Sequence, residues 1–366
     1  MNFTDFLQLN LHFAAAAQTV TVRRLLAGPQ RPGWSWGFES TVHFLRCHAP
    51  HGNRITAAQV RRLMDQIVPP LGNQVTMRPA IGLPVRGEWV TAGPVNDAQL
   101  ALFLHGGGYV AGSPRTYRGL TTALARACGV RLLALDYRLA PEHPFPAALD
   151  DACAVYRWLL AHNMDPSRIV FIGDSAGGGL TIAALTRLRD AGLPLPRAAV
   201  LISPWLDLSL SCASIRTNCG VDYLNPELAA ACARMYLSGL DAQTPLASPL
   251  YADLRGLPPL LIQTGSAELL CDEARTFAQR AQATGVNVTL EVWDEMIHDW
   301  HMLHWLEPQA RAAIAQIGSY VKKALNPPTT PSDPPLATRQ APPAATGQLE
   351  PIGYPIVTLR KVGFHV

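Results

Sequence analysis

Seven short apolar runs, separated by stretches with helical periodicity, constrain the fold of this chain more than any other feature. Between about residue 87 and residue 325 the runs are GEWVTA, QLALFLHG, RLLALDYR, RIVFIGDS, AAVLISPW, PPLLIQTG and VTLEVWDE. Several are almost continuously apolar, as is typical of parallel strands that are covered on both faces. Helical stretches such as 146–163 and 176–192 lie between them. The alternation predicts an α/β fold, with a mostly parallel central sheet and helices on both faces.

Two regions interrupt the alternation and predict a cap. Residues 1–60 have helical character, and residues 207–246 read as a helical insertion after the strand that ends at Trp205. Open α/β sheets bind ligands at the carboxyl ends of their strands. We therefore expect N-terminal cap helices over 1–60 and a cap insertion over 207–246, both covering a catalytic domain at 61–325.

The last part of the chain has a different composition. Residues 326–351 are rich in Pro, Thr and Ala, which predicts a disordered tail over 326–366. The final YPIVTLRKVGFHV has strand-like character again, and docking on the body, addition to a sheet edge and an unselected extension all fit it. Because the sheet is expected to be complete by the helix that ends near Leu325, we expect the tail to be dispensable.

Charge and hydropathy exclude several classes of partner. The 366 residues include 30 Lys and Arg against 27 Asp and Glu, and a net charge of +3 is too small to indicate a nucleic-acid partner. No apolar run approaches the ~20 residues of a membrane span, and the N-terminus lacks the basic region of a signal peptide. We expect no nucleic-acid or membrane partner, while a homodimer stays open.

The seven cysteines are scattered, odd in number and never spaced as CxxC. This pattern favours reduced thiols in a cytoplasmic protein over a disulfide framework or a zinc site.

Ser175 lies on a sharp turn between a predicted strand and a predicted helix. The sequence Gly173-Asp-Ser175-Ala-Gly177 matches G-x-S-x-G, the nucleophile elbow, in which flanking glycines avoid collisions and the serine hydroxyl projects over the sheet edge. A serine becomes an effective nucleophile only when a base accepts its proton. The motif in this context predicts a nucleophilic serine.

A second glycine-rich turn follows the strand QLALFL. His105-Gly-Gly-Gly108 is an HGGG-type loop whose backbone N–H groups can bind an oxyanion, and it lacks the Lys-Ser/Thr of a phosphate-binding loop. The expected donors are the N–H groups of Gly107, Gly108 and Ala176, whereas His105 is expected to be structural.

Four motifs together resemble the microbial hormone-sensitive-lipase family of α/β-hydrolases. They are HGGGYVAGS, LDYRLAPEHPFPAALDD, GDSAGGGL and LISPWLDLS, and the resemblance covers about residues 60–325 in unbroken order. It implies the α/β-hydrolase fold with a helical cap, and a serine carboxylesterase that acts on short acyl esters without a cofactor. It also implies that Arg138, Glu142 and Asp150 are scaffold charges.

The resemblance implies that His298 is the base, because EMIHDWH resembles the family's G-M-x-H-x-F pattern and follows the strand VTLEVW. His298, His301 and His304 have i, i+3, i+6 spacing, which on a helix spreads them over ~120°. With no Cys or carboxylate set to complete a ligand shell, we expect no metal site.

The acid that orients the base is expected in SAELLCDEA, after the strand PPLLIQTG. Glu268 occupies the place where the family usually has Asp, and it is the favoured residue. Asp272 is the second choice, because it reads more simply as a carboxylate at a helix start.

These residues predict ester hydrolysis through Ser175, Glu268 and His298 on short- to medium-chain acyl esters, with a small-molecule ester as substrate. A lactone hydrolase or an amide deacetylase would use the same triad, and both stay open. Because the family's N-terminal helices cover the acyl pocket, Trp34, Trp36 and Phe38 are expected to form a pocket wall; the alternative is that they fasten the cap to the body.

Overall fold

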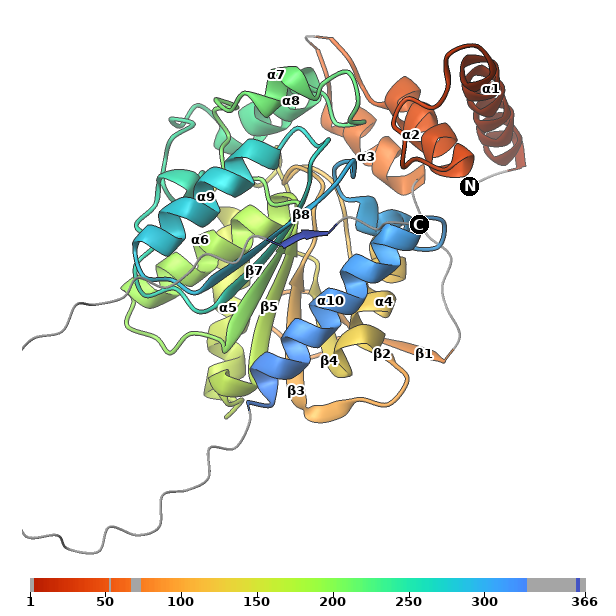
Figure 1. Cartoon of the computed structure of the whole chain (residues 1–366). Coiled ribbons are helices and arrows are strands. Elements are labelled where there is room, and N and C mark those ends of the chain that lie inside the picture. Colours follow the sequence, from red (N-terminus) through yellow and green to blue (C-terminus); the bar gives the residue numbers. More distant parts are fainter. Residues whose placement is uncertain (1–2, 53, 67–73, 328–359, 363–366) are drawn as a thin grey trace, which may run out of the picture.

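The computed structural model describes residues 3–52, 54–66, 74–327 and 360–362, and within them it has one nine-stranded sheet (Figure 1). The strand order is β1-β2-β4-β3-β5-β6-β7-β8-β9, and β2 runs antiparallel to both β1 and β4 while the remaining pairs are parallel. The strands are β1 (Val75–Pro79), β2 (Gly87–Ala92), β3 (Asn96–Leu104), β4 (Val130–Leu135), β5 (Ile169–Asp174), β6 (Ala198–Ile202), β7 (Leu260–Gly265), β8 (Val288–Trp293) and β9 (Arg360–Val362).

Helices cover both faces of this sheet, which explains the nearly continuous apolar runs. In β3, Leu102 and Leu104 belong to one hydrophobic cluster, whereas Ala101 and Phe103 belong to another on the opposite face. The first cluster lies under α5 (Ala147–Ala161), α6 (Ala176–Asp190) and α9 (Cys271–Ala283), and the second under α4 (Arg118–Cys128) and α10 (Pro308–Leu325).

The remaining helices gather at one end of the sheet (Figure 1). They are α1 (Phe3–Ala27), α2 (Trp36–His48), α3 (Ala57–Gln66), α7 (Ser214–Thr217) and α8 (Pro226–Leu237). Helix α8 begins with a side-chain cap, since Asn225 accepts a hydrogen bond from the N–H of Leu228 and Pro226 occupies the first turn. Apart from the end of α3, these helices lie within residues 1–60 and 207–246, where the sequence predicts a cap.

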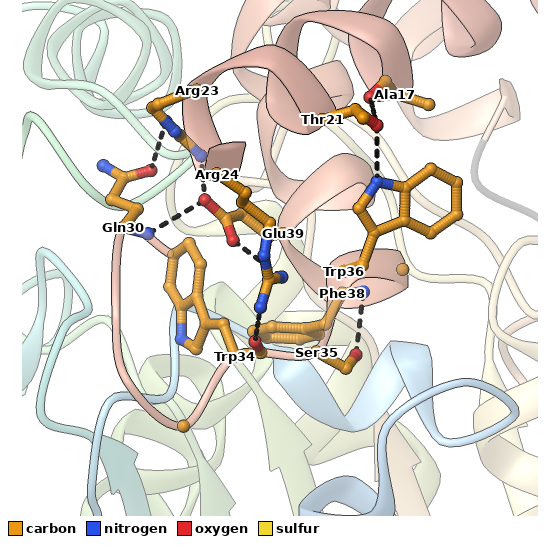
Figure 2. A network of polar contacts seen from close by, with 12 residues as sticks. Ala17, Thr21, Arg23, Arg24, Gln30, Trp34, Ser35, Trp36, Phe38 and Glu39 are labelled. Atoms are coloured by element: carbon orange, nitrogen blue, oxygen red, sulfur yellow. Dashed lines mark hydrogen bonds and ion pairs between the residues drawn. The ribbon is translucent and has the colours of Figure 1, made fainter. Parts of the chain in front are cut away.

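A buried carboxylate holds α1 against α2. Glu39 is fully buried, and its carboxylate forms ion pairs with Arg23 and with Arg24, the latter at 3.0 Å. It also accepts a hydrogen bond of 2.9 Å from the N–H of Gln30 (Figure 2). Two cations and a backbone donor therefore compensate one carboxylate.

The seven predicted strands are confirmed as β2 to β8, and the expected α/β-hydrolase architecture is present. The expectation that the sheet ends with the residues before Leu325 is wrong, because Arg360–Val362 pairs in parallel with β8. The rest of the predicted tail, 328–359 and 363–366, lies outside the described residues. Within the described ranges no helix has both the length and the apolar character needed to cross a membrane, and each of the seven cysteines is free.

Candidate active site

Ser175 occupies the turn between β5 and α6 in a backbone conformation that non-glycine residues rarely adopt, with φ 52° and ψ −119°. The neighbouring glycines make this turn sterically feasible. A Cβ at Gly177 would lie 1.9 Å from the carbonyl oxygen of Leu104, and a Cβ at Gly173 would lie 2.2 Å from the carbonyl oxygen of Gly177. The glycines around Ser175 therefore allow this turn to pack against the backbone of neighbouring segments.

The structure brings Ser175 and His298 together. Nε2 of His298 lies 2.9 Å from Oγ of Ser175, and both residues are buried, His298 at 3% exposure. His298 follows β8, and its backbone N–H donates to Oδ1 of Asp222 at 3.2 Å. The hydroxyl of Ser175 is thus in place to donate to an imidazole whose own loop is fixed.

Glu268 is fully buried in the loop after β7. One carboxylate oxygen accepts a 2.7 Å hydrogen bond from the hydroxyl of Ser203, and the other accepts one from Thr264. Burial raises the pKa of Glu268 to about 8, while the charge of His298 acts to lower that pKa. Glu268 and His298 therefore interact electrostatically, although Nδ1 of His298 makes no hydrogen bond within the described part of the chain.

Asp272, the second choice for the acid, lies in the first turn of α9 and faces another helix. Its carboxylate accepts a 2.9 Å hydrogen bond from the N–H of Ser214 at the start of α7. Its place in the first turn of α9 agrees with the expected helix-start position, but its carboxylate bonds the backbone of α7.

Gly107 and Gly108 line the same pocket as Ser175 and His298. Both have positive φ, 105° and 64°, and their N–H groups donate to no other group in the described residues. Ala176 is the first residue of α6, where an α-helix leaves the N–H without an intrahelical acceptor. Three backbone donors therefore lie in the segments next to the hydroxyl of Ser175.

Helix α8 packs directly on this glycine loop. A Cβ at Gly108 would lie 2.8 Å from Sγ of Cys232, and the ring of Tyr109 stacks on Tyr236 with a centroid distance of 3.8 Å and an interplanar angle of 3°. The loop and the cap insertion thus form one packed unit.

The pocket above Ser175 has mostly apolar walls, which come from the cap and from the loops after β7 and β8. Its aliphatic and sulfur-containing lining residues are Leu45, Val60, Leu63, Met64, Leu224, Leu228, Ala229, Cys232, Leu270, Ile297, Met302 and Leu303. Such a lining suits an acyl or alkyl group.

The aromatic residues of 34–38 are absent from this lining, and the expectation that they form the pocket wall is wrong. Trp34 and Phe38 pack with Trp293 and Trp300 in a separate hydrophobic cluster, and Nε1 of Trp34 donates to the carbonyl of Glu295 at 2.8 Å. Trp36 is 48% exposed and donates to Thr21 of α1 (Figure 2). Because Trp34 and Phe38 bury their rings against the catalytic domain, they fasten the N-terminal helices to it.

The three other histidines of these motifs, His105, His301 and His304, have structural surroundings. His105 is buried, its Nδ1 bonds the carbonyl of Gly106 at 2.7 Å, and desolvation lowers its pKa to about 4. Nε2 of His301 donates to Oε1 of Gln263 at 2.7 Å, and burial lowers the pKa of His301 to about 3. His304 bonds the carbonyl of His301. No cluster of three or more potential ligands that could hold a metal ion occurs in the described residues.

Sequence reasoning overlooked three buried aspartates at this site. Asp222 bonds the N–H groups of His298 and Leu269, and so joins the loop after β8 to the loop after β7. Asp174 precedes Ser175 and Asp299 follows His298. Their positions next to Ser175 and His298 could have indicated that they lie at the site. Asp222 lies in the cap insertion, where no motif indicates it.

Comparison with known proteins agrees with this architecture. A family model described as the alpha/beta hydrolase fold matches residues 101–302. An acetyl-hydrolase of Streptomyces hygroscopicus is 49% identical over 238 residues, which is 65% of this chain and 79% of that protein. An esterase of Acinetobacter venetianus is 34% identical over 291 residues, 78% of this chain and 96% of that protein.

Solved structures are similar over the same region. The crystal structure of an esterase from the bacterial hormone-sensitive lipase family has a TM-score of 0.74 and 48% identity, and the match covers 77% of this chain and 95% of that one. The structure of EstE5 soaked with p-nitrophenyl butyrate has a TM-score of 0.75 and 40% identity, with 78% and 97% covered.

Proposed function

Because the chain belongs to the α/β-hydrolase family, as an esterase of the hormone-sensitive-lipase type, we propose that it hydrolyses short- to medium-chain acyl esters through Ser175, His298 and Glu268. Carboxylic ester hydrolysis itself is the activity of its named relatives. The observation that carries the assignment is the 2.9 Å contact between Nε2 of His298 and Oγ of Ser175 at the base of an apolar pocket.

The proposed reaction has two halves. Nε2 of His298 accepts the proton of Ser175 as Oγ attacks the ester carbonyl, and it then delivers that proton to the departing alcohol. A water molecule, activated by the same nitrogen, releases the acid from the acyl-enzyme. Glu268 stabilises the imidazolium when its carboxyl group is ionised, and the charge of His298 favours that ionisation by lowering the pKa of Glu268.

The oxyanion of each tetrahedral intermediate is proposed to bind the N–H groups of Gly107, Gly108 and Ala176. Backbone donors fixed in this way stabilise the transition state without reorganising, and that is the largest contribution in many acyl transfers. In support of this role, the N–H groups of Gly107 and Gly108 donate to no group in the part of the chain that the structure describes.

The first test is Ser175→Ala. We expect the variant to fold normally and to lose esterase activity by several orders of magnitude, because the attacking oxygen is gone. A fluorophosphonate probe should label the wild-type protein at Ser175 alone, as mapped by peptide mass spectrometry. Labelling at another residue, or near-normal turnover by the variant, would contradict the assignment.

The acyl range is tested with p-nitrophenyl esters from acetate to palmitate. Each methylene that the pocket accommodates gains about 0.8 kcal/mol, so kcat/KM should rise to about butanoate or hexanoate and fall once the chain meets the wall. Leu228→Ala should extend the accepted length, because Leu228 lines the pocket. Leu237→Ala on the same helix is the control, since Leu237 is also buried but lies outside the lining.

A further inference from the structure

Helix α1 is apolar on two opposite sides, although it lies at the outer edge of the cap, beyond α2 (Figure 1). On one side Ala16, Ala17 and Val20 are buried. The ion pairs of Glu39 hold this side on α2. A helix that is apolar on both sides is normally buried between two partners. Helix α2 is one partner, and the opposite side of α1 has the composition of a second interface.

The opposite side of α1, which we call the outer face, is exposed and uncharged. Leu11, Val22 and Leu25 are 60%, 50% and 83% exposed. Successive residues of an α-helix are rotated by about 100°, so positions three, four and seven apart lie on the same side. Residues 6–22 contain no Asp, Glu, Lys or Arg. The members of the outer face are Leu11, Ala14, Ala15, Gln18, Val22, Leu25 and Leu26.

The side chains of the outer face are arranged almost symmetrically about Gln18. Leu11 and Leu25 lie seven residues before and after it, and Ala14 and Val22 lie four residues before and after it. When two copies of α1 pack antiparallel with a two-fold axis at Gln18, Leu11 faces Leu25 of the partner subunit. Val22 then faces Ala14 of the partner subunit, so that a larger side chain meets a smaller one. A single sequence therefore supplies both halves of a matched helix pair.

We propose that the protein forms a two-fold symmetric dimer in which the outer faces of two α1 helices pack antiparallel. Removal of Leu11, Val22 and Leu25 of both subunits from water provides the driving force. The amide of Gln18 has both donors and an acceptor, so the two Gln18 side chains can form reciprocal hydrogen bonds at the axis. The interface is thus apolar along its length and polar only at its centre.

A second copy suits the outer face better than a lipid surface does. Helices that lie on membranes have Lys and Arg beside their apolar side, and these cations attract anionic headgroups. Arg23 and Arg24 follow the uncharged stretch of α1, but both form ion pairs with Glu39 on the side that packs on α2. Gln18 lies at the centre of the outer face, where hydrocarbon would leave its amide without hydrogen bonds, whereas a second copy supplies them.

The dimer should be weak enough for its dissociation to be measured. One helix from each subunit should give a smaller interface than the ~1,600 Å² of a standard complex, so we expect a dissociation constant of about 10 μM. Formation of this dimer does not require the proposed esterase activity, and Ser175→Ala should dimerise like wild type.

The test is sedimentation velocity on the full chain from about 1 to about 200 μM, which brackets that dissociation constant. Leu11→Lys and Leu25→Glu each place a charge opposite a leucine of the partner subunit, so each variant alone should weaken the dimer by at least about 100-fold. In an equimolar mixture of the two variants, the introduced lysine of one subunit faces the introduced glutamate of the other, and the remaining leucines face each other. The mixture should therefore form a heterodimer.

Ile81→Lys is the matched control, because Ile81 is a 90% exposed aliphatic residue in the turn after β1, outside α1. It should dimerise like wild type, and circular dichroism should show that every variant is folded, since the replaced side chains are all exposed. A wild type that stays monomeric, single variants that still dimerise, or a mixture that stays monomeric would each overturn the proposal. Flotation of monomeric wild type with vesicles of phosphatidylcholine and phosphatidylglycerol would also overturn it and would assign the outer face to lipid.

Discussion

Glu39 and the carboxyl groups beside His298 are equally buried, yet they are neutralised in different ways. Glu39 receives two arginines and a backbone N–H, so its charge is compensated permanently (Figure 2). Glu268, Asp174 and Asp299 have no arginine or lysine among the described residues, and burial raises the pKa of all three. A carboxylate with fixed countercharges serves architecture, whereas one without them can change its protonation when a neighbouring charge appears.

The largest expected effect is a loss of catalytic activity when Glu268, which has no arginine or lysine partner among the described residues, is replaced. Glu268→Gln should lower kcat by about 10³-fold, because an amide, unlike the carboxyl group of Glu268, cannot ionise when the imidazolium of His298 forms. Steady-state kinetics with p-nitrophenyl butyrate measures the change. Asp272→Asn is the matched control and should act mainly on stability; if that variant is the inactive one, the assignment of the acid is reversed.

The second effect concerns stability. Glu39→Gln should lower the free energy of unfolding by about 3 kcal/mol, because it leaves Arg23 and Arg24 facing a buried neutral group. Urea denaturation measures this, and kcat should be unchanged. Asp150→Asn, which removes a half-exposed partner of Arg187, should cost less than about 1 kcal/mol. Equal costs for the two variants would mean that the buried network of Figure 2 contributes no more than a surface pair.

The smallest effect is a pH dependence of stability. Below about pH 4.5 Glu268 is protonated in the folded and the unfolded chain alike. Between that pH and about 8 the unfolded chain has lost the proton while the folded chain retains it, so ionisation of Glu268 lowers stability as pH rises. The urea midpoint of Glu268→Gln should therefore rise relative to that of wild type between pH 5 and pH 8. A constant difference between the two proteins over this range would rule out a raised pKa in Glu268.

The parts of this molecule that could be predicted from sequence are those encoded by local pattern. The seven apolar runs alternate at period two between two helical layers, so their residues alone indicated buried strands. Ser175 and His298 each follow a strand that the pattern identified, and they lie in contact as expected. Their catalytic roles stay predictions until the variants are measured.

The parts that could not be predicted depend on partners far away in the chain. Trp34 and Phe38 looked like a pocket wall, but Trp293 and Trp300, about 260 residues later, bury them in a separate cluster. Asp222 bonds two backbone N–H groups in loops that the sequence does not connect to it. The role of such a side chain depends on the path of a distant loop, so the residues next to it in the sequence do not reveal that role.

The packing of Gly108 against Cys232 has a consequence for protein engineering. Chimeras that exchange the cap insertion between relatives are an obvious route to new substrate preferences. In this protein the insertion is not an independent module, because Cys232 and Tyr236 touch the loop that carries the proposed oxyanion donors. A graft that brings a foreign α8 without its own glycine loop would therefore disturb turnover along with selectivity, and the two segments should be transplanted together.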